Sequence, residues 1–337
     1  MLISLIAAAV GSSKKHALSP TTRLVVRSRA ASSAPPVSLS AAPATSAVAS
    51  ASRPTSAPSS VPPPTTTPAA PPSGAPADAL AGFEPASVTF VSSTQGFVLG
   101  GSKTCSTSTC GLLASTSDGG VNWSLVALFP APISGPNPAV SKVRFATKND
   151  GWAFGPQLWS THDGGRTWTA QATPGPVYDV EASGGVAYLL EATCGTEPCV
   201  QGDRLLQTPV SSDGWTAISG PKLADGPGSL APHGNTVWVV VNGGGTSTFD
   251  MVVGGNNWHR LANPCAAAGA DLALVGVAPV STTQLFELCA GDPGAGSETK
   301  VVLFSSDGGA HATATSAAPA RGGLASGIAE ASTAVVA

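Results

Sequence analysis

A short motif of one acid, two glycines and a tryptophan recurs along this chain and constrains its fold more than any other feature. Its best copies are STSDGGVNW at 115–123 and STHDGGRTW at 160–168. Weaker copies follow around Asp213, Val253 and Asp307, so the acid positions lie 45, 50, 40 and 54 residues apart. A unit that recurs at such intervals is typical of a repeat architecture, which favours a structural role for the motif over a chemical one.

Short apolar segments alternate with glycine-rich turns from residue 80 onward. Runs such as GFVLGG, GWAFG and TVWVVVN have the length of strands, and no helical periodicity separates them. Four strands per unit of about 40–50 residues are the signature of a propeller blade. We therefore expect an all-β propeller of four-stranded antiparallel blades over residues 80–337. About five blades can be counted, and GGLASGIAEASTAVVA supplies part of a sixth, as in a truncated six- or seven-bladed ring.

The residue types of the motif have a mechanical explanation. An acid at the head of a tight turn accepts hydrogen bonds from backbone N–H groups two and three residues further on. The glycines supply positive φ angles, and the tryptophan buries a large surface between neighbouring sheets. We assign this structural role, and no catalytic one, to Thr116, Asp118, Gly120, Trp123, Thr161, Asp163, Gly165, Trp168, Asp213, Trp215, Gly255, Trp258, Asp307 and Gly309.

The motif resembles the Asp-box, or BNR repeat, of sialidase-like propellers. The stretch VSKVRFATKNDGWAFGPQLWSTHDGGRTWTA at 140–170 is more similar still to the Ycf48/HCF136-like group, in which a V-x-F strand precedes GW-x-x-G and then the box. The resemblance extends over about residues 83–310 and weakens toward the C-terminus. It implies that the boxes lie on the periphery, away from the ligand end of the channel, which supports the structural role of Asp118 and Asp163.

A sialidase is the enzymatic alternative that this resemblance raises. The resemblance implies that such an enzyme has three arginines around the substrate carboxylate. It also implies a tyrosine nucleophile with a glutamate partner, and an aspartate that acts as the acid. The residues available for these roles include Arg144, Arg166, Arg204, Arg260, Arg321, Tyr178, Tyr188, Glu181 and Glu191. The Arg-Ile-Pro motif of sialidases is absent. We expect a non-enzymatic binding or scaffold module that recognises a protein or a glycan through its propeller face, with an exo-α-sialidase-like hydrolase as the alternative.

Charge and motifs predict neither a nucleic-acid partner nor a cofactor. Residues 1–80 have a net charge of +5 and the remainder has −8, so the body lacks the basic footprint of a nucleic-acid binder. The glycine-rich NGGGTST at 242–248 lacks the Gly-Lys-Ser/Thr of a phosphate loop. The histidines show no ligand spacing, and each box carries one acid where a calcium loop supplies several. We expect no cofactor and no metal.

Six cysteines fall into neighbouring pairs, Cys105/Cys110, Cys194/Cys199 and Cys265/Cys289. An even number in such pairs indicates three local disulfides and an oxidising compartment. Zinc is the rival interpretation. We favour disulfides, because CSTSTC and CGTEPC have four residues between their cysteines and no histidine lies close to either pair.

The N-terminal region predicts export. Residues 1–12 contain the apolar run LISLIAAAV, which is too short to span a bilayer and fits part of a signal or membrane anchor. Residues 13–79 form a linker that is rich in Pro, Ala, Ser and Thr over most of its length, and we expect it to be disordered. The chain is thus expected to be an extracytoplasmic monomer, secreted or tethered to a membrane through its N-terminus.

Overall fold

A computed structural model of the chain describes residues 80 and 82–336, with gaps at 103–110, 134–137, 195–201, 244–245, 270, 293–296, 316–324, 326 and 332–333. Over these residues the chain forms five four-stranded antiparallel sheets and a two-stranded sheet. The only helix in this part is a 3₁₀ turn, η1 (Pro264–Ala267). The expected all-β fold with five four-stranded blades is confirmed. The predicted segments 1–12 and 13–79 lie outside the described residues.

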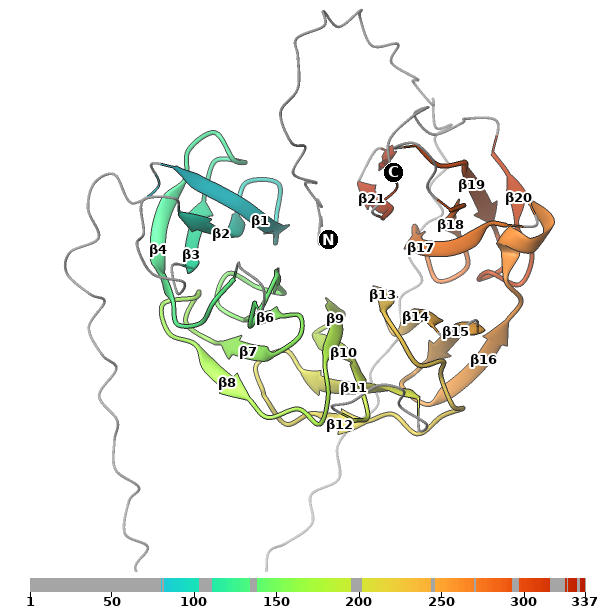
Figure 1. Cartoon of the computed structure of the whole chain (residues 1–337), viewed down its shortest axis with the longest axis horizontal. Coiled ribbons are helices and arrows are strands. Elements are labelled where there is room, and N and C mark those ends of the chain that lie inside the picture. The colour runs from blue at the N-terminus through green and yellow to red at the C-terminus, as the bar shows by residue number, and fades with distance from the viewer. Residues whose placement is uncertain are drawn as a thin grey trace, which may run out of the picture. The chain divides into compact units, whose positions relative to one another are not determined.

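Each four-stranded sheet is a meander in which consecutive strands pair (Figure 1). Sheet 1 contains β1 (Phe83–Phe90), β2 (Gly96–Ser102), β3 (Gly111–Thr116) and β4 (Ser124–Phe129), and sheet 2 contains β5 (Lys142–Phe145), β6 (Gly151–Phe154), β7 (Leu158–Thr161) and β8 (Thr169–Gln171). Sheet 3 contains β9 (Val177–Ser183), β10 (Val186–Ala192), β11 (Asp203–Pro209) and β12 (Thr216–Ala217), and sheet 4 contains β13 (Gly228–His233), β14 (Thr236–Gly243), β15 (Thr246–Val253) and β16 (Asn257–Leu261). Sheet 5 contains β17 (Ala273–Pro279), β18 (Leu285–Ala290), β19 (Lys300–Ser305) and β20 (Thr313–Ala314). The pair β21 (Ala329–Ala331) and β22 (Ala334–Val336) follows where the sequence predicts part of a sixth blade.

Strand β14 shows why the inner strands read as continuous apolar runs. Its side chains alternate between two cores: Val237 and Val239 pack in the cluster shared with sheet 3, and Trp238 and Val240 pack in the cluster shared with sheet 5. A strand that is buried on both faces needs apolar residues at every position. The sequence TVWVVVN satisfies both cores at once.

Four apolar clusters, one between each pair of consecutive sheets, hold the sheets together. Between sheets 1 and 2, the rings of Phe97 and Phe145 stack with their centroids 3.7 Å apart. Between sheets 2 and 3, Trp152 is fully buried beside Trp215, at a centroid distance of 6.0 Å. The first strands of consecutive sheets contact one another directly, and in Figure 1 they lie on the same side of the successive sheets.

Polar ties supplement these clusters at every junction between consecutive sheets. The Ser87 hydroxyl accepts a hydrogen bond from the Val143 N–H at 3.0 Å, which joins β1 to β5. Arg144 of β5 pairs with Glu181 of β9, and Asp179 of β9 accepts from the Leu230 N–H of β13 at 2.9 Å. The amide nitrogen of Asn242 in β14 donates to Leu274 O of β17 at 2.8 Å, completing the series. Burying these polar groups is tolerable because each of these contacts gives them a partner.

Candidate functional site at the box turns and the loop end

The box of sheet 1 is a closed network of hydrogen bonds within a single turn. Asp118 Oδ1 accepts from the Thr116 hydroxyl at 2.7 Å and from the Asn122 N–H at 2.9 Å, while its Oδ2 accepts from the Asn122 side-chain amide at 2.7 Å. The Thr116 hydroxyl oxygen in turn accepts from the Gly120 N–H at 3.0 Å. Threonine and acid therefore divide the N–H groups of the turn between them.

The boxes of sheets 2 and 5 repeat this network. Asp163 accepts from the Thr161 hydroxyl and from the N–H and hydroxyl of Thr167, and Asp307 accepts from Ser305 and from the N–H and ring of His311. The backbone donor lies four residues after the acid in all three turns. We expected donors two and three residues on. The N–H two residues on bonds the threonine or serine instead, and the N–H three residues on, from Val121 or Arg166, also acts on Asp118 or Asp163. The glycine-rich turn is wide enough to bring the fourth residue back onto the acid.

Several of the box glycines lie close to atoms of other residues, so a Cβ atom at these positions has little space. Gly165 has φ = 84°, and a Cβ atom there would overlap the side chain of Leu113 in sheet 1. The neighbouring Trp168 packs edge-on against Phe129 of sheet 1, with centroids 5.1 Å apart. In this box the turn thus closes its own hairpin and also rests on the preceding sheet, which fits the structural role that we expect for it.

A second tie connects four of the five box turns to the first hairpin of the same sheet. The N–H of the glycine after the acid position donates to a carbonyl in the turn between the first and second strands, at 2.9 Å from Gly119 to Thr94 and at 2.7 Å from Gly308 to Thr283. The same bond is present from Gly164 to Asn149 and from Gly254 to Asn235. We call this end of the sheets the box end, and the opposite end the loop end.

Hydrogen bonding lowers the pKa of the box acids of sheets 1, 2 and 5. Hydrogen bonds from Asn122 and Thr116 lower the pKa of Asp118 to about 2, and hydrogen bonds from His311 and Ser305 lower the pKa of Asp307 to about 2. Burial acts to raise the pKa of Asp163, but the bonds from Thr167 and Thr161 outweigh it, so that pKa is also lowered. A general acid or base works best with a pKa near the operating pH, so these groups are poorly matched to proton transfer.

The shortened box of sheet 3 departs from the pattern. Asp213 reaches across to sheet 2, where its Oδ2 accepts from the Ser160 hydroxyl at 2.8 Å and from the Gln171 amide at 3.1 Å. His162 bridges the two sheets, with Nδ1 2.8 Å from Asp150 Oδ1 and Nε2 3.4 Å from Asp213 Oδ1. The acid in this copy joins two sheets, because its turn is three residues shorter between acid and tryptophan and cannot wrap around the carboxylate.

The box of sheet 4 keeps only its glycines and tryptophan. Val253 stands at the acid position, and the Trp258 Nε1–H donates to Ser219 O at 2.9 Å, outside its own turn. In sheets 1 and 2, by contrast, Trp123 and Trp168 donate to the second box glycine, Gly120 or Gly165, each at 3.1 Å. Gly255 keeps a positive φ of 81° and faces Gln207 of sheet 3.

The bridge at His162 predicts a pH-dependent contribution to stability. Burial acts to lower the pKa of His162, but Asp150 and Asp213 outweigh it and the pKa is raised above 6.5. The bridge is therefore fully present below about pH 6.5 and is lost as the pH rises through the folded-state pKa. We expect His162→Ala to lower the free energy of unfolding by about 0.5 kcal/mol at pH 6 and by less at pH 8.5. Urea unfolding at both pH values measures this, with the exposed His259→Ala as control; equal losses at the two pH values would contradict it.

The arginines do not converge on a substrate site within the described part of the chain. Arg144 pairs with Glu181 at 2.7 Å, Arg204 with Glu191 at 2.6 Å, and Arg260 with Asp250 at 2.5 Å, each at a different place in the sheets. Arg166 donates to the carbonyl of Asp163 in its own turn, and Arg321 lies outside the described residues. The three-arginine cluster of a sialidase is therefore not formed by the four arginines that the structure describes.

The tyrosines are also poorly placed for nucleophilic attack. Tyr188 is buried, with 3% of its surface exposed, and burial raises its pKa. Tyr178 packs at the edge of the same apolar cluster between sheets 3 and 4. Burial raises the pKa of Glu191, although Arg204 acts in the opposite direction. These side chains therefore belong to packed cores and ion pairs.

One predicted disulfide is confirmed directly. Cys265 of η1 is bonded to Cys289 of β18, and both residues are fully buried. Cys194 is also disulfide-bonded, whereas Cys105, Cys110 and Cys199 lie outside the described residues. Disulfides are typical of oxidising compartments. Across the described ranges, no helix has the length and apolar character to cross a membrane, and no cluster of His, Cys, Asp and Glu has the arrangement of a metal site.

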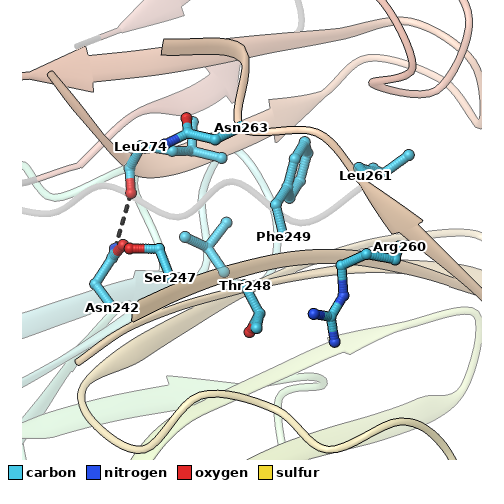
Figure 2. A pocket seen from close by; sticks show the side chains of 9 residues that line it. Asn242, Ser247, Thr248, Phe249, Arg260, Leu261, Asn263 and Leu274 are labelled. Atoms are coloured by element: carbon cyan, nitrogen blue, oxygen red, sulfur yellow. Dashed lines mark hydrogen bonds between the residues drawn. The ribbon is translucent and has the colours of Figure 1, made fainter. Parts of the chain in front are cut away.

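A small cavity lies between sheets 4 and 5. It has a volume of about 40 Å³ and is lined by residues that include Asn242, Thr248, Phe249, Arg260 and Leu274 (Figure 2). Ligand pockets for drug-sized molecules measure roughly 300–1,000 Å³, whereas a water molecule needs only about 10–15 Å³. This cavity can therefore hold water, but it is too small for a sugar or a large peptide side chain.

The loop end varies much more from sheet to sheet than the box end does. The connection between the second and third strands covers 155–157 in sheet 2, 193–202 in sheet 3 and 291–299 in sheet 5, and those of sheets 1 and 3 contain cysteine pairs. In the sequence, these cysteine pairs are the feature that distinguishes the loop-end connections of sheets 1 and 3. Binding residues lie disproportionately on loops that a rigid scaffold positions, so the loop end is the candidate binding surface.

The five four-stranded antiparallel sheets define an all-β fold of the propeller type. Solved structures with similar folds include "YCF48 bound to D1 peptide" (18% identity, TM-score 0.42, 66% of this chain and 64% of that one) and Ycf48 from Cyanidioschyzon merolae (17%, 0.43, 68% and 68%). A GH74 enzyme from Niastella koreensis is also similar (13%, 0.37, 70% and 50%). This chain thus spans 64% of the first of these proteins. No family model and no curated protein matches the sequence.

Proposed function

We propose that the chain is a non-enzymatic, extracytoplasmic binding or scaffold module that recognises a protein or a glycan through the loop end of its sheets. The distribution of the arginines carries this proposal. Three of the four described arginines form ion pairs with carboxylates in separate parts of the sheets, and the fourth is bonded within a box turn. An enzyme that grips an anionic sugar would need such groups to converge.

Two further observations support a binding role. The box acids are bonded within their own turns or across to the neighbouring sheet, and the cavity between sheets 4 and 5 is too small for a substrate. The loop end, by contrast, offers connections of variable length on a repetitive scaffold. The disulfides support an extracytoplasmic location, where the segment 13–79 would act as a stalk and segment 1–12 as part of a signal or anchor.

Binding and turnover separate this proposal from a hydrolase. The full chain is tested on a glycan array and a peptide array, and in parallel with a fluorogenic sialoside and xyloglucan as substrates. We expect a ligand to be retained and no substrate to be hydrolysed. Hydrolysis that is abolished by Tyr188→Phe or Tyr178→Phe would overturn the proposal in favour of a sialidase-like enzyme.

The binding surface is mapped with matched charged substitutions. Ala273 lies exposed at the start of β17, at the loop end, and Val121 is 79% exposed at the box end. Because both side chains face solvent, arginine at either position should leave stability within about 0.5 kcal/mol. We expect Ala273→Arg to weaken ligand retention and Val121→Arg to leave it unchanged. The reverse result would place the binding surface at the box end.

A further inference from the structure

One buried acid lies where the other sheets have apolar residues. Glu287 is in β18, two residues after Leu285, which pairs with the box residue Ser305. The residues at the same register in sheets 1 and 2 are Val98 and Ala153, which are both buried. Sequence reasoning missed Glu287 because a single acid within QLFELCA looks like the polar position of an ordinary half-exposed strand.

Glu287 points into the apolar cluster between sheets 4 and 5, which we call the seam. Residues two apart on a strand share a face, and both Leu285 and Cys289 belong to the seam, together with Trp238 and Val277. Glu287 is 0% exposed, and neither of its carboxyl oxygens has a hydrogen-bond partner. A buried ionised carboxylate without a partner is strongly unfavourable, so the group stays neutral or the seam rearranges.

Two other buried acids of the sheets differ from Glu287. Glu191 is paired with Arg204, and Asp250 is paired with Arg260, so the charge of each acid is compensated. Glu287 has no such cation. Ionisation of Glu287 would therefore place an uncompensated charge in the packing of sheet 5 against sheet 4.

The charges around the seam make ionisation of Glu287 still less favourable. Strands β14 and β17 carry no charged residue, the Asp250 of β15 is neutralised by Arg260 of β16, and His259 of β16 is exposed. Lys300 begins β19 at the far, loop end of that strand. Asp307, just after β19, is the charge that acts on Glu287. Burial first and Asp307 second raise the pKa of Glu287 to about 7.

We propose that the seam between sheets 4 and 5 is a proton-controlled contact, closed while Glu287 is neutral and loosened when Glu287 ionises. The sign follows from linkage: the folded-state pKa is raised, so the contribution of Glu287 is fully present below about pH 4.5 and is lost as the pH rises through about 7. The disulfide between Cys265 and Cys289 ties η1, in the connection from sheet 4, to β18, so this connection stays attached to sheet 5 when the seam loosens. The device is independent of any bound ligand.

Amide hydrogen exchange of the full chain at pH 5.5 and pH 8.5 tests this proposal, after correction for the intrinsic rate. We expect opening of β17, β18 and β19 to be roughly 30-fold more frequent at pH 8.5, if the open state titrates like a free glutamate. The strands β5, β6 and β7 of sheet 2 should change little. Equal corrected protection of sheet 5 at both pH values would overturn the proposal.

Two substitutions make the test specific. Glu287→Gln removes the titration at constant shape, and Glu287→Met replaces the carboxyl with an apolar group of similar length. We expect both variants to lose the pH dependence in sheet 5, and the exposed Glu84→Gln in β1 to keep it. If the amide exchange of sheet 5 still depends on pH in folded Glu287→Met, the proposal is wrong. Infrared titration compares the wild-type chain with Glu287→Gln, because burial also raises the pKa of Glu181 to about 7. A protonated-carboxyl signal above pH 5 that is partly lost in Glu287→Gln supports the proposal, and a signal that the substitution leaves unchanged contradicts it.

Discussion

Replacing Trp238 with alanine is expected to lower the free energy of unfolding by about 3–5 kcal/mol. Trp238 is fully buried in the seam, and its Nε1–H donates to Gly308 O in the box turn of sheet 5 at 2.9 Å. The substitution removes a large apolar surface, leaves a cavity and takes away the partner of a buried carbonyl. Equilibrium unfolding in urea measures the loss.

A conservative pair of variants separates the hydrogen bond from the packing. Trp238→Phe should cost about 1–2 kcal/mol beyond its packing loss, because Gly308 O loses its donor. Trp152 is equally buried between sheets 2 and 3, but its Nε1 has no hydrogen-bond partner. Trp152→Phe should therefore cost less than Trp238→Phe. Equal losses in the two variants would show that the bond to Gly308 contributes nothing measurable.

Removing the disulfide between Cys265 and Cys289 is expected to cost about 3 kcal/mol. The two cysteines are 24 residues apart in sequence, and closing a loop of that length restricts the unfolded chain by about this amount. Cys265→Ala combined with Cys289→Ala tests this by urea unfolding. The wild-type chain, unfolded in urea with a reductant present, serves as control for the loss of the disulfide without substitution. Because both positions lie in the seam, the double variant should also show faster amide exchange in β18 than in β6.

An unchanged midpoint in the double variant would contradict this account of the seam. It would mean that the packing of Leu285, Trp238 and Val277 alone holds sheet 5 in place. A loss of the same size in every sheet, without a preference for β17 to β19, would instead indicate a global effect on the unfolded chain. The two outcomes are separated by exchange measured strand by strand.

The periodic features of the fold could be read from the sequence. The spacing of the acid–glycine–tryptophan copies and the four apolar runs between them predicted five four-stranded sheets, and the structure has them. The cysteine pattern predicted the bond between Cys265 and Cys289. These features are local, or repeat at a fixed interval, so a single chain displays them without any knowledge of its contacts.

The features that were missed depend on contacts between sheets. Asp213 binds Ser160 and Gln171 of sheet 2; the shortened turn around it is visible in the sequence, but its partners in the neighbouring sheet are not. Trp238 donates to Gly308, 70 residues away. Glu287 is buried only because sheet 4 covers it. The main backbone donors to the box acids lie four residues on, one or two residues later than expected, because the wide geometry of the turn, with two consecutive glycines at positive φ, was not anticipated.

A double-mutant cycle on Thr161 and Asp163 tests most directly whether the box residues fasten their turns. The Thr161 hydroxyl donates to Asp163 Oδ1 at 2.9 Å and accepts from the buried Gly165 N–H at 2.9 Å. Unfolding free energies are measured for Thr161→Val, Asp163→Ala and the double variant. We predict that each single variant loses about 1–3 kcal/mol and that the pair couples by about 1–2 kcal/mol. Unchanged stability with no coupling, accompanied by loss of ligand binding or of hydrolysis in Asp163→Ala, would contradict a structural role for the box.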